Sequence, residues 1–307
     1  MRADFLWGAS TSAHQTEGNN LNSDWWALET SGRVPQRSGD ACDSYHRYRQ
    51  DMALLAGAGL NAYRFSVEWA RIEPEQGCFS RAELDHYRRM IDYARDVDLS
   101  PVVTLHHFTF PRWLAAQGGF WFDGASDAFA RYVERVCRIL TDVDWVVTIN
   151  EPNILNAMHM GAAEPPRDAG RFGPDEADAA QLAAVHARAV EIVHGLTSAR
   201  VGWSIAQQAL EPIPGHEEAF ERANRRWDDL YLEAARGDDF IGVQSYTSQK
   251  VGPDGVLPHP GAPDNTLTGW AYRPDALEIS LRRAWRVGGG VPLLVTENGI
   301  ATSDDHV

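Results

Sequence analysis

The stretch from residue 145 to residue 153 reads Trp145-Val146-Val147-Thr148-Ile149-Asn150-Glu151-Pro152-Asn153. Its first part is a short apolar run rich in β-branched residues, which is typical of a strand buried on both faces of a sheet. The run ends in an amide, a carboxylate and a proline, and a proline cannot continue a central strand. A buried strand that ends in polar side chains indicates a parallel sheet with its functional groups at the carboxyl ends of the strands.

Six more apolar runs of this kind alternate with helical patterns along the chain, as in sheets built from strand–helix repeats. The seven predicted strands cover residues 5–10, 62–69, 101–107, 145–150, 200–206, 240–246 and 292–296. Six helical segments lie between them. In Ala82–Val97, for example, apolar residues recur every three or four positions with charged residues between them. We therefore predict an α/β fold with a parallel sheet that can close into a barrel.

The overall composition restricts the class of protein. The 307 residues include 28 basic and 43 acidic side chains, which gives a formal net charge of −15. Nucleic acids and anionic membranes are therefore excluded as partners, because binding them requires clustered Lys and Arg. Hydrophobic residues make up 44% of the chain, enough for one large globular core. Eleven tryptophans suggest a sugar-binding cleft, and ordinary core packing is the simpler alternative.

Nothing in the sequence directs the chain into a membrane or out of the cell. Residues 1–7 lack the apolar run of a secretory signal, and no window approaches the roughly 18 apolar residues of a membrane span. Cys42, Cys78 and Cys137 are far apart and odd in number, so they suggest neither a disulfide framework nor a zinc site. We therefore expect a cytoplasmic protein.

Glycines at Gly57 and Gly59 resemble the start of a dinucleotide-binding motif, but the order of elements around them is wrong. A phosphate-binding turn follows a strand and precedes a helix, whereas here a helical pattern precedes the glycines and a strand follows. We predict that these glycines end a helix.

Polar side chains gather where the predicted strands end. They are His106-His107 after the third strand, Asn150-Glu151 after the fourth, Gln244-Ser245-Tyr246 after the sixth and Glu297 after the seventh. In a closed barrel these ends converge and place Glu151 and Glu297 across a cleft. Such a pair suits glycosidic cleavage, in which one carboxyl group is protonated and the other ionised, and Arg64 could hold one of them ionised. The alternative is that both are exposed loop carboxylates.

Several stretches together resemble glycoside hydrolase family 1, the β-glucosidase family. Residues 5–18, Phe5-Leu6-Trp7-Gly8-Ala9-Ser10-Thr11-Ser12-Ala13-His14-Gln15-Thr16-Glu17-Gly18, resemble its first-strand signature, and Tyr63-Arg64-Phe65-Ser66 with Trp69 and Arg71 resemble its second. Asn150-Glu151-Pro152 and Thr296-Glu297-Asn298-Gly299 resemble its acid/base and nucleophile motifs. Related barrel hydrolases share the Asn150-Glu151-Pro152 motif, but the full set of motifs in this order is specific to family 1.

The resemblance implies a (β/α)8 TIM-barrel fold as one catalytic domain over residues 1–307, with seven strands visible. It also implies a retaining β-glycosidase that cleaves small β-glucoside-like substrates with no metal or organic cofactor. By motif, Glu151 would be the general acid/base and Glu297 the nucleophile. Gln15, His107 and Asn150 would contact sugar hydroxyls, Tyr246 would lie beside the nucleophile, Arg64 would be its charge partner, and Gln244 would support the site.

The sequence departs from the family pattern in three places. Phe108 and Thr109 follow His107 where the family has an aromatic residue and an acid, and Gln244-Ser245-Tyr246 replaces the more usual Asn-Tyr-Tyr, which puts the contribution of Gln244 in doubt. Glu297 lies ten residues from the end, so there is no room for the eighth strand or for the tryptophan and glutamate that grip outer sugar hydroxyls in the family.

A sheet of seven strands would have two unpaired edges. We expect the chain to be a fragment; a complementing segment, a homo-oligomer or a distorted seven-stranded form are the alternatives. Two other functions stay open: a sugar-binding barrel that has lost turnover, and an endo-acting glycanase of the same barrel clan. The sequence leaves the glycone and aglycone undetermined.

Overall fold

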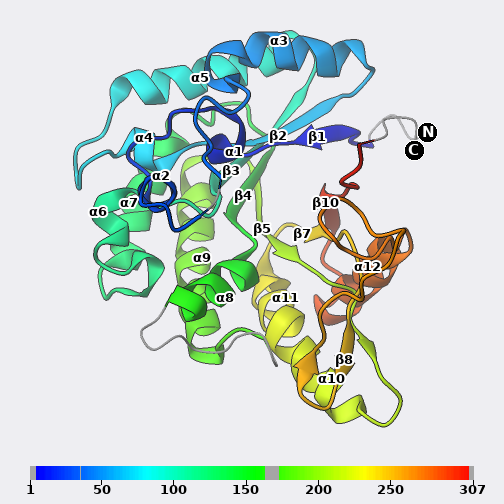
Figure 1. Ribbon diagram of the computed structural model, residues 1–307. Helices are drawn as coiled ribbons and strands as arrows, with labels where there is room; N and C mark the ends of the chain where they lie inside the picture. Colours follow the sequence, from blue (N-terminus) through cyan, green and yellow to red (C-terminus); the bar gives the residue numbers. More distant parts are fainter. Residues whose placement is uncertain (1–4, 35, 163–172, 304–307) are drawn as a thin grey trace. The chain divides into compact units, whose positions relative to one another are not determined.

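The computed structural model describes residues 5–34, 36–162 and 173–303 (Figure 1). These residues group into two compact units. The first unit comprises Met1–Asn150 with Ala184–Val201, and the second comprises Glu151–Ala183 with Gly202–Val307. The organisation of the chain as one catalytic domain stays a prediction, and each unit is described by itself below.

Seven parallel strands follow one another in the order β1-β2-β3-β4-β5-β7-β10. Their bounds are β1 Gly8–Ser10, β2 Ala62–Ser66, β3 Ser100–His106, β4 Trp145–Asn150, β5 Arg200–Ala206, β7 Ile241–Gln244 and β10 Leu293–Glu297. This is the order of the first seven strands of a (β/α)8 barrel, so the predicted fold class is confirmed. All seven predicted strands are present, and those at 145–150 and 200–206 have the predicted bounds.

In the first unit, β1 to β4 pair in parallel with their neighbours, and Ser10 lies opposite Arg64 while Ser66 lies opposite Thr104. The helical elements of this unit are α1 Ala13–Thr16, α2 Asp24–Thr30, α3 Ser44–Gly57, α4 Trp69–Ile72, α5 Arg81–Asp96, α6 Arg112–Ala115, η1 Gly119–Trp121 and α7 Ala125–Cys137. Helix α9, Glu176–Leu196, begins in the second unit and continues in the first. Figure 1 shows α3 and α5 side by side, and α5 also contacts β3. The amphipathic pattern expected for 82–97 is borne out, because α5 buries Tyr87, Met90, Ile91 and Ala94.

The predicted strand at 62–69 ends three residues early, since Trp69 begins α4. The Glu68 side chain accepts a hydrogen bond from the Ala70 backbone N–H and thereby caps this helix. At the end of α3, Gly59 has a φ of +84°, and the Leu60 N–H donates to the Leu55 carbonyl. This is the glycine-terminated helix end that the sequence predicted at Gly57–Gly59.

The second unit holds β5 from Gly202 onward, β7 and β10, and β7 lies between the other two strands. Its helical elements are α8 Pro152–Ala162, α10 Glu217–Asn224, the π-helical turn η2 Arg225–Asp229, α11 Leu230–Ala234, η3 Ala235–Gly237 and α12 Ala276–Val287. A small second sheet joins β6 Glu211–Pro212, β8 Lys250–Gly252 and β9 Gly255–Val256, and the sequence did not predict it. An apolar cluster of Leu210, Ala219, Ala223 and Val251 packs α10 against this sheet.

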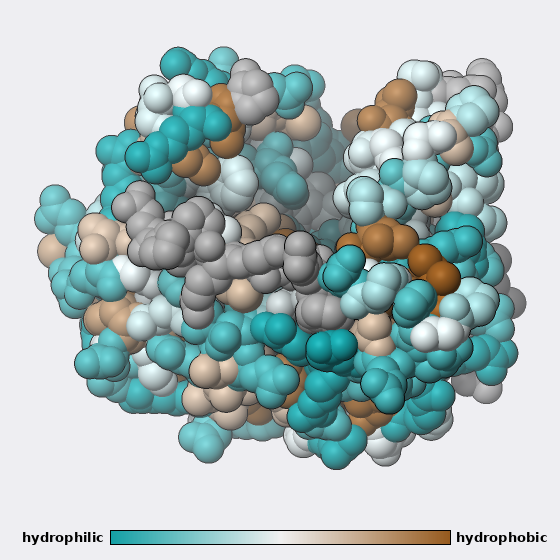
Figure 2. All heavy atoms as spheres, turned by 60° about the horizontal axis from the view of Figure 1, so that its bottom comes forward, coloured by the Kyte–Doolittle hydropathy of each residue, from teal (hydrophilic) through white to brown (hydrophobic). Residues whose placement is uncertain are grey.

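The remaining sequence-based expectations concern the surface and the loops. Residues 163–175 contain three prolines and several charged residues, a composition that predicts a loop. Positions 163–172 lie outside the described residues, and residues 173–175 form no helix or strand. The helices that the structure describes are all too short or too polar to cross a membrane. The face drawn in Figure 2 is mainly hydrophilic, with its hydrophobic residues in small separate patches.

Candidate active site

The eight predicted site residues divide between the two units. Gln15, Arg64, His107 and Asn150 belong to the first unit, and Glu151, Gln244, Tyr246 and Glu297 belong to the second. Both predicted catalytic carboxylates are therefore in the same unit. The predicted pairing of Arg64 with Glu297 joins the two units and stays a prediction.

Glu297 is the last residue of β10. Val295 pairs with Val243 and Glu297 pairs with Gln244, so Thr296 is an extra residue that makes a β-bulge directly before the carboxylate. The Gln244 amide donates to Glu297 Oε1 at 2.8 Å, and the Tyr246 hydroxyl donates to Oε2 at 2.5 Å. Each carboxylate oxygen thus accepts a hydrogen bond from a neighbouring side chain, and the two bonds fix the orientation of the group.

Gln244 contacts Glu297 directly, although its departure from the family pattern had put its contribution to the site in doubt. Its side chain is fully buried and directly supports Glu297, so this departure from the usual asparagine still places an amide at the site. Asn298, which follows Glu297, is fixed to the residue after β7, because its Nδ2 donates to the Ser245 carbonyl at 2.7 Å. The end of β7 therefore fixes the end of β10 through three side-chain hydrogen bonds.

Glu151 follows β4 directly and has a left-handed backbone conformation, with a φ of +45°. Few non-glycine residues adopt this conformation, and those that do are concentrated at functional sites. Its backbone N–H donates to the Ser204 carbonyl of β5 at 2.7 Å. Asn153 anchors the start of α8 nearby, because its buried amide donates to the Ala206 carbonyl at 2.6 Å. The half-buried Glu151 side chain is thus placed by contacts on both sides of its backbone.

Arg64 lies at the centre of a buried polar network in the first unit. Its guanidinium donates to Asn150 Oδ1 at 2.5 Å, to Thr104 Oγ1 at 3.0 Å and to Ser10 Oγ at 3.2 Å. One side chain on β2 therefore ties together β1, β3 and β4. Because Arg64 occupies the oxygen of the Asn150 amide, the nitrogen of that amide faces His107 Nε2 at 3.2 Å.

The His107 ring is neutral at physiological pH. Burial lowers its pKa well below the ordinary value, and the positive charge of Arg64 and the neighbouring His106 lower it further. As Nε2 faces the amide nitrogen of Asn150, it is the acceptor, and the ring proton lies on Nδ1. Neighbouring His106 is different: its ring packs on Phe110 and Phe120, and burial lowers its pKa to about 3. His106 is therefore a core residue of the first unit.

Gln15 is exposed on α1, and its amide is held in one orientation. The buried Ser12 hydroxyl donates to Gln15 Oε1 at 2.6 Å, which leaves the amide nitrogen as the outward donor. The start of α1 is tied to β2, since the Ala13 N–H donates to Ser66 Oγ at 2.8 Å. The sequence did not single out Ser12, although it lies inside the first-strand motif.

The other departure noted in the sequence also has a structural explanation. Phe108 has a φ of +67° and turns the chain after β3, so that the Thr109 hydroxyl donates to Glu68 Oε2 at 2.8 Å. Glu68 is fully buried, and burial raises its pKa to about 8. Thr109 therefore supports a buried neutral carboxyl group in the first unit.

Trp270 lies beside one of the predicted site residues, and the sequence analysis did not single it out. Its ring centre lies 5.8 Å from that of Tyr246, the residue that donates to Glu297, and it is 37% exposed. A partly exposed aromatic face at this position is of the kind that packs on the C–H face of a sugar. The tryptophan count pointed to such residues as a class, but it could not identify this one among eleven.

Comparison with known proteins assigns the chain to the same family that its motifs resemble. The sequence profile described as glycosyl hydrolase family 1 matches residues 1–247. The thermostable β-glucosidase B of Thermobispora bispora is 32% identical over 357 residues, which cover 98% of this chain and 73% of that protein.

Solved structures with similar folds include two β-glycosidases. The β-glycosidase BGL167 is 43% identical with a TM-score of 0.87, and the match covers 99% of this chain and 79% of that one. The β-glycosidase from Pyrococcus horikoshii is 35% identical with a TM-score of 0.88, covering 98% and 77% of the two chains. The extent of the family match, together with this identity and coverage, shows that the chain belongs to glycosyl hydrolase family 1 and is a glycoside hydrolase.

Proposed function

We propose that the protein is a retaining β-glycosidase that hydrolyses small β-glucoside-like substrates by double displacement. The observation that carries this proposal is the orientation of Glu297, whose two oxygens accept hydrogen bonds from Gln244 and Tyr246. A nucleophile in this reaction must be held in position to attack the anomeric carbon, and both donors restrict the carboxylate to one orientation. The left-handed backbone of Glu151 and the bulge before Glu297 give further support, since such irregularities concentrate at active sites.

In the first step, a Glu297 oxygen attacks the anomeric carbon while Glu151 donates its proton to the leaving glycosidic oxygen. The bond between the anomeric carbon and that oxygen breaks, the aglycone leaves as an alcohol, and the sugar is esterified to Glu297. In the second step, Glu151 removes a proton from water, whose oxygen attacks the anomeric carbon. The ester bond breaks, and both carboxyl groups return to their starting states with the anomeric configuration retained.

The first unit supplies the groups that we propose for binding the sugar. The outward amide nitrogen of Gln15 can donate to a hydroxyl, and the Asn150 amide, oriented by Arg64, is proposed to contact the 2-hydroxyl. The neutral His107 ring can exchange hydrogen bonds with sugar hydroxyls without a change of charge. We also propose that Arg64 acts as the charge partner of Glu297, because a nearby cation favours an ionised carboxylate.

The proposed substrate class agrees with the printed names of the relatives, several of which are β-glucosidases. We propose a cytoplasmic location as well, because Cys42, Cys78 and Cys137 are free thiols in the structure.

Replacement of Glu297 tests the assignment of the nucleophile. Glu297→Ala is expected to lower kcat for 4-nitrophenyl β-glucoside by roughly 1000-fold or more, because no covalent intermediate can form. Glu218→Ala serves as the matched control, since it removes an exposed glutamate of the same unit. Undiminished hydrolysis by Glu297→Ala, with the circular dichroism spectrum unchanged, would refute the assignment.

Replacement of Glu151 tests the acid/base role separately. Glu151→Gln is expected to slow hydrolysis of an alkyl β-glucoside far more than glycosylation by 4-nitrophenyl β-glucoside, whose leaving group needs little protonation. Equal loss for both substrates would contradict that role. Calorimetric binding of cellobiose without any turnover by the parent chain would favour a sugar-binding module, and faster cleavage of a polymer than of cellobiose would favour an endo-glycanase.

A further inference from the structure

The first unit contains a pocket that the proposed mechanism does not use. It lies between α2 and α6, which are neighbours in Figure 1, and it has a volume of about 490 Å³. This volume falls within the range of small-molecule sites, about 300–1,000 Å³. The pocket is therefore large enough for one ring of a small ligand.

Hydrogen bonds fix the two walls of the pocket to each other. The Asp24 N–H donates to the Phe110 carbonyl at 2.9 Å, and the Arg112 N–H donates to the Asn22 carbonyl at 2.9 Å. The Asp24 side chain adds a third link, because its Oδ1 accepts from the Phe110 N–H at 2.9 Å. The start of α2 and the start of α6 therefore hold their relative positions without a ligand.

The pocket combines an apolar wall with two cationic side chains. Ala27 and Leu28 of α2 and Ala115 of α6 supply the apolar part. Arg33, which follows α2, and Arg112, the first residue of α6, supply two guanidinium groups. Both arginines are exposed, so a ligand from solvent can reach their charged groups.

The two guanidinium groups have no carboxylate partner among the described residues. Other arginines of the chain do pair with acidic side chains, as Arg71 does with Glu17 at 2.8 Å. Asp24 is the one acidic residue that lines the pocket, and its Oδ1 accepts from the backbone N–H groups of Trp25 and Phe110 instead. Both guanidinium groups are therefore available to an anionic ligand.

The charge of the lining residues narrows the class of anion. Burial raises the pKa of Asp24 to about 6, so this carboxyl group is mostly ionised at about pH 7.5. Two arginines and one ionised aspartate leave a net charge of +1, which matches a monoanion. A guanidinium group binds a carboxylate through two parallel N–H···O bonds and also stacks on aromatic rings. The ligand that fits best is a carboxylate with a flat apolar body.

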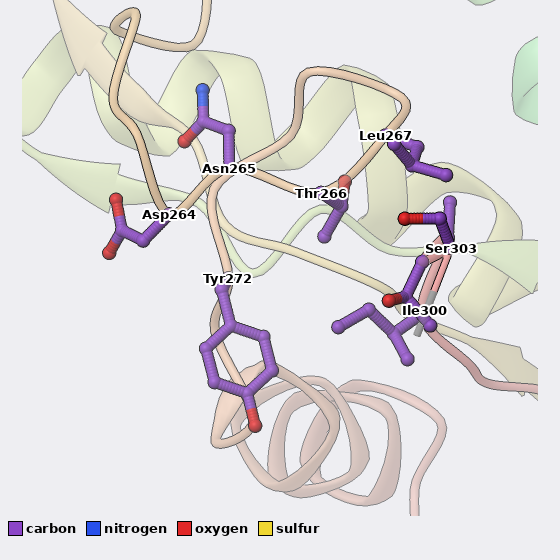
Figure 3. Close-up of a pocket in the computed structure, with 9 residues that line it drawn as sticks. Asp264, Asn265, Thr266, Leu267, Tyr272, Ile300 and Ser303 are labelled. Atoms are coloured by element: carbon purple, nitrogen blue, oxygen red, sulfur yellow. The ribbon is translucent and has the colours of Figure 1, made fainter. Parts of the chain in front are cut away.

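The pocket drawn in Figure 3 has the opposite electrostatic character. It lies between the segments 264–272 and 300–303 of the second unit, and none of the nine described residues that line it is Lys or Arg. Its charged side chain, Asp264, is acidic and would repel an anion. A small organic anion is therefore expected to bind in the first unit and not in this second pocket.

We propose that the pocket between α2 and α6 is a binding site for a small organic carboxylate with an aromatic or similarly flat apolar body. Arg33 and Arg112 bind the carboxylate, and the body packs on the apolar wall. None of the eight proposed site residues lines this pocket, so the inference holds whether or not the protein hydrolyses glycosides.

Titration of the full chain with benzoate, followed by saturation-transfer NMR, tests the site. Benzoate has a carboxylate on an apolar ring, benzamide has the same shape without the charge, and acetate has the charge without the ring. We expect benzoate to bind with a Kd of roughly 1 mM or below. Benzamide and acetate are each expected to bind at least about 10-fold more weakly, because each lacks one of the two features that the pocket recognises.

Variants of the two arginines locate the binding. Arg33→Ala and Arg112→Ala are each expected to weaken benzoate binding roughly 10-fold, because each removes charge-assisted hydrogen bonds to the carboxylate. Arg81→Ala and Arg89→Ala are the matched controls, since they remove exposed arginines of α5 in the same unit. Circular dichroism spectra check that all four variants are folded.

Four outcomes would overturn the proposal. The first is a lack of saturable benzoate binding, and the second is benzamide binding as tight as that of benzoate. The third is a benzoate affinity that survives both pocket variants or that the control variants lower equally, because the ligand then binds elsewhere. The fourth is tighter binding of inorganic phosphate than of benzoate, which would mean that the pocket selects phosphate.

Discussion

Gln244 and Tyr246 each donate a hydrogen bond to one carboxylate oxygen of Glu297, and these two donors differ in kind. The Gln244 amide is fully buried, whereas the Tyr246 phenol is half-buried and makes the shorter bond, at 2.5 Å. A short bond from a hydroxyl to an ionised carboxylate is among the stronger hydrogen bonds in proteins. We therefore expect Tyr246 to contribute more than Gln244 to keeping the proposed nucleophile aligned.

Tyr246→Phe removes this bond and keeps the ring. Loss of a hydrogen bond to a charged group corresponds to about 1.5–3 kcal/mol, so kcat/KM for 4-nitrophenyl β-glucoside is expected to fall roughly 10- to 150-fold. Tyr93→Phe in the first unit is the control. An unchanged kcat/KM in Tyr246→Phe would contradict the role given to the phenol.

The sequence predicted several local features of the site and missed others for a physical reason. The motifs predicted that Tyr246 lies beside Glu297, and the hydrogen bond between the two side chains shows this contact. The contact of Gln244 with the carboxylate could not be predicted, because it depends on the bulge at Thr296 that shifts β10 by one residue. Contacts such as Ser12 with Gln15 depend on side-chain rotamers, which have no periodic signal in a sequence.

At the scale of elements, long apolar runs made the seven parallel strands predictable. The strands at 145–150 and 200–206 are fully bounded by polar or turn residues, and their predicted ends are correct. The strands β6, β8 and β9 have only two or three residues each, too few to show the alternation that marks a strand. Their pairing is set by tertiary packing against α10, which a single sequence does not reveal.

The close approach of β5 and β7 depends on a residue without a side chain. A Cβ at Gly242 would lie 2.4 Å from Ser204 Oγ and 2.8 Å from the Ser204 Cα. Gly242→Ala is therefore expected to destabilise the protein by about 1–3 kcal/mol, because β7 must move away from β5. Gly237→Ala is the matched control, since a Cβ there meets no atom within 4 Å. Urea unfolding of both variants measures the difference, and equal stabilities would contradict this account of strand packing.

At the scale of the whole molecule, buried carboxyl groups with raised pKa values contribute to the pH dependence of stability. Burial raises the pKa of Glu68 to about 8, of Glu17 and Asp228 to about 7 and of Asp24 to about 6. Each of these groups binds a proton more strongly in the folded chain than in the unfolded chain. Their contribution to the free energy of unfolding is therefore complete at acidic pH and is lost as the pH rises through the folded-state pKa.

Glu68→Gln isolates one of these contributions. The neutral amide can replace the protonated carboxyl group, because its oxygen can accept from the Ala70 N–H and its nitrogen can donate to the Thr109 hydroxyl. As the pH rises from about 5 to 8, the parent protein should lose stability relative to this variant by up to about 1.4 kcal/mol per pH unit. Urea unfolding at several pH values measures this slope, and Glu278→Gln on the exposed face of α12 is the control. A difference between parent and variant that stays constant over this range would mean that Glu68 is ionised in the folded protein.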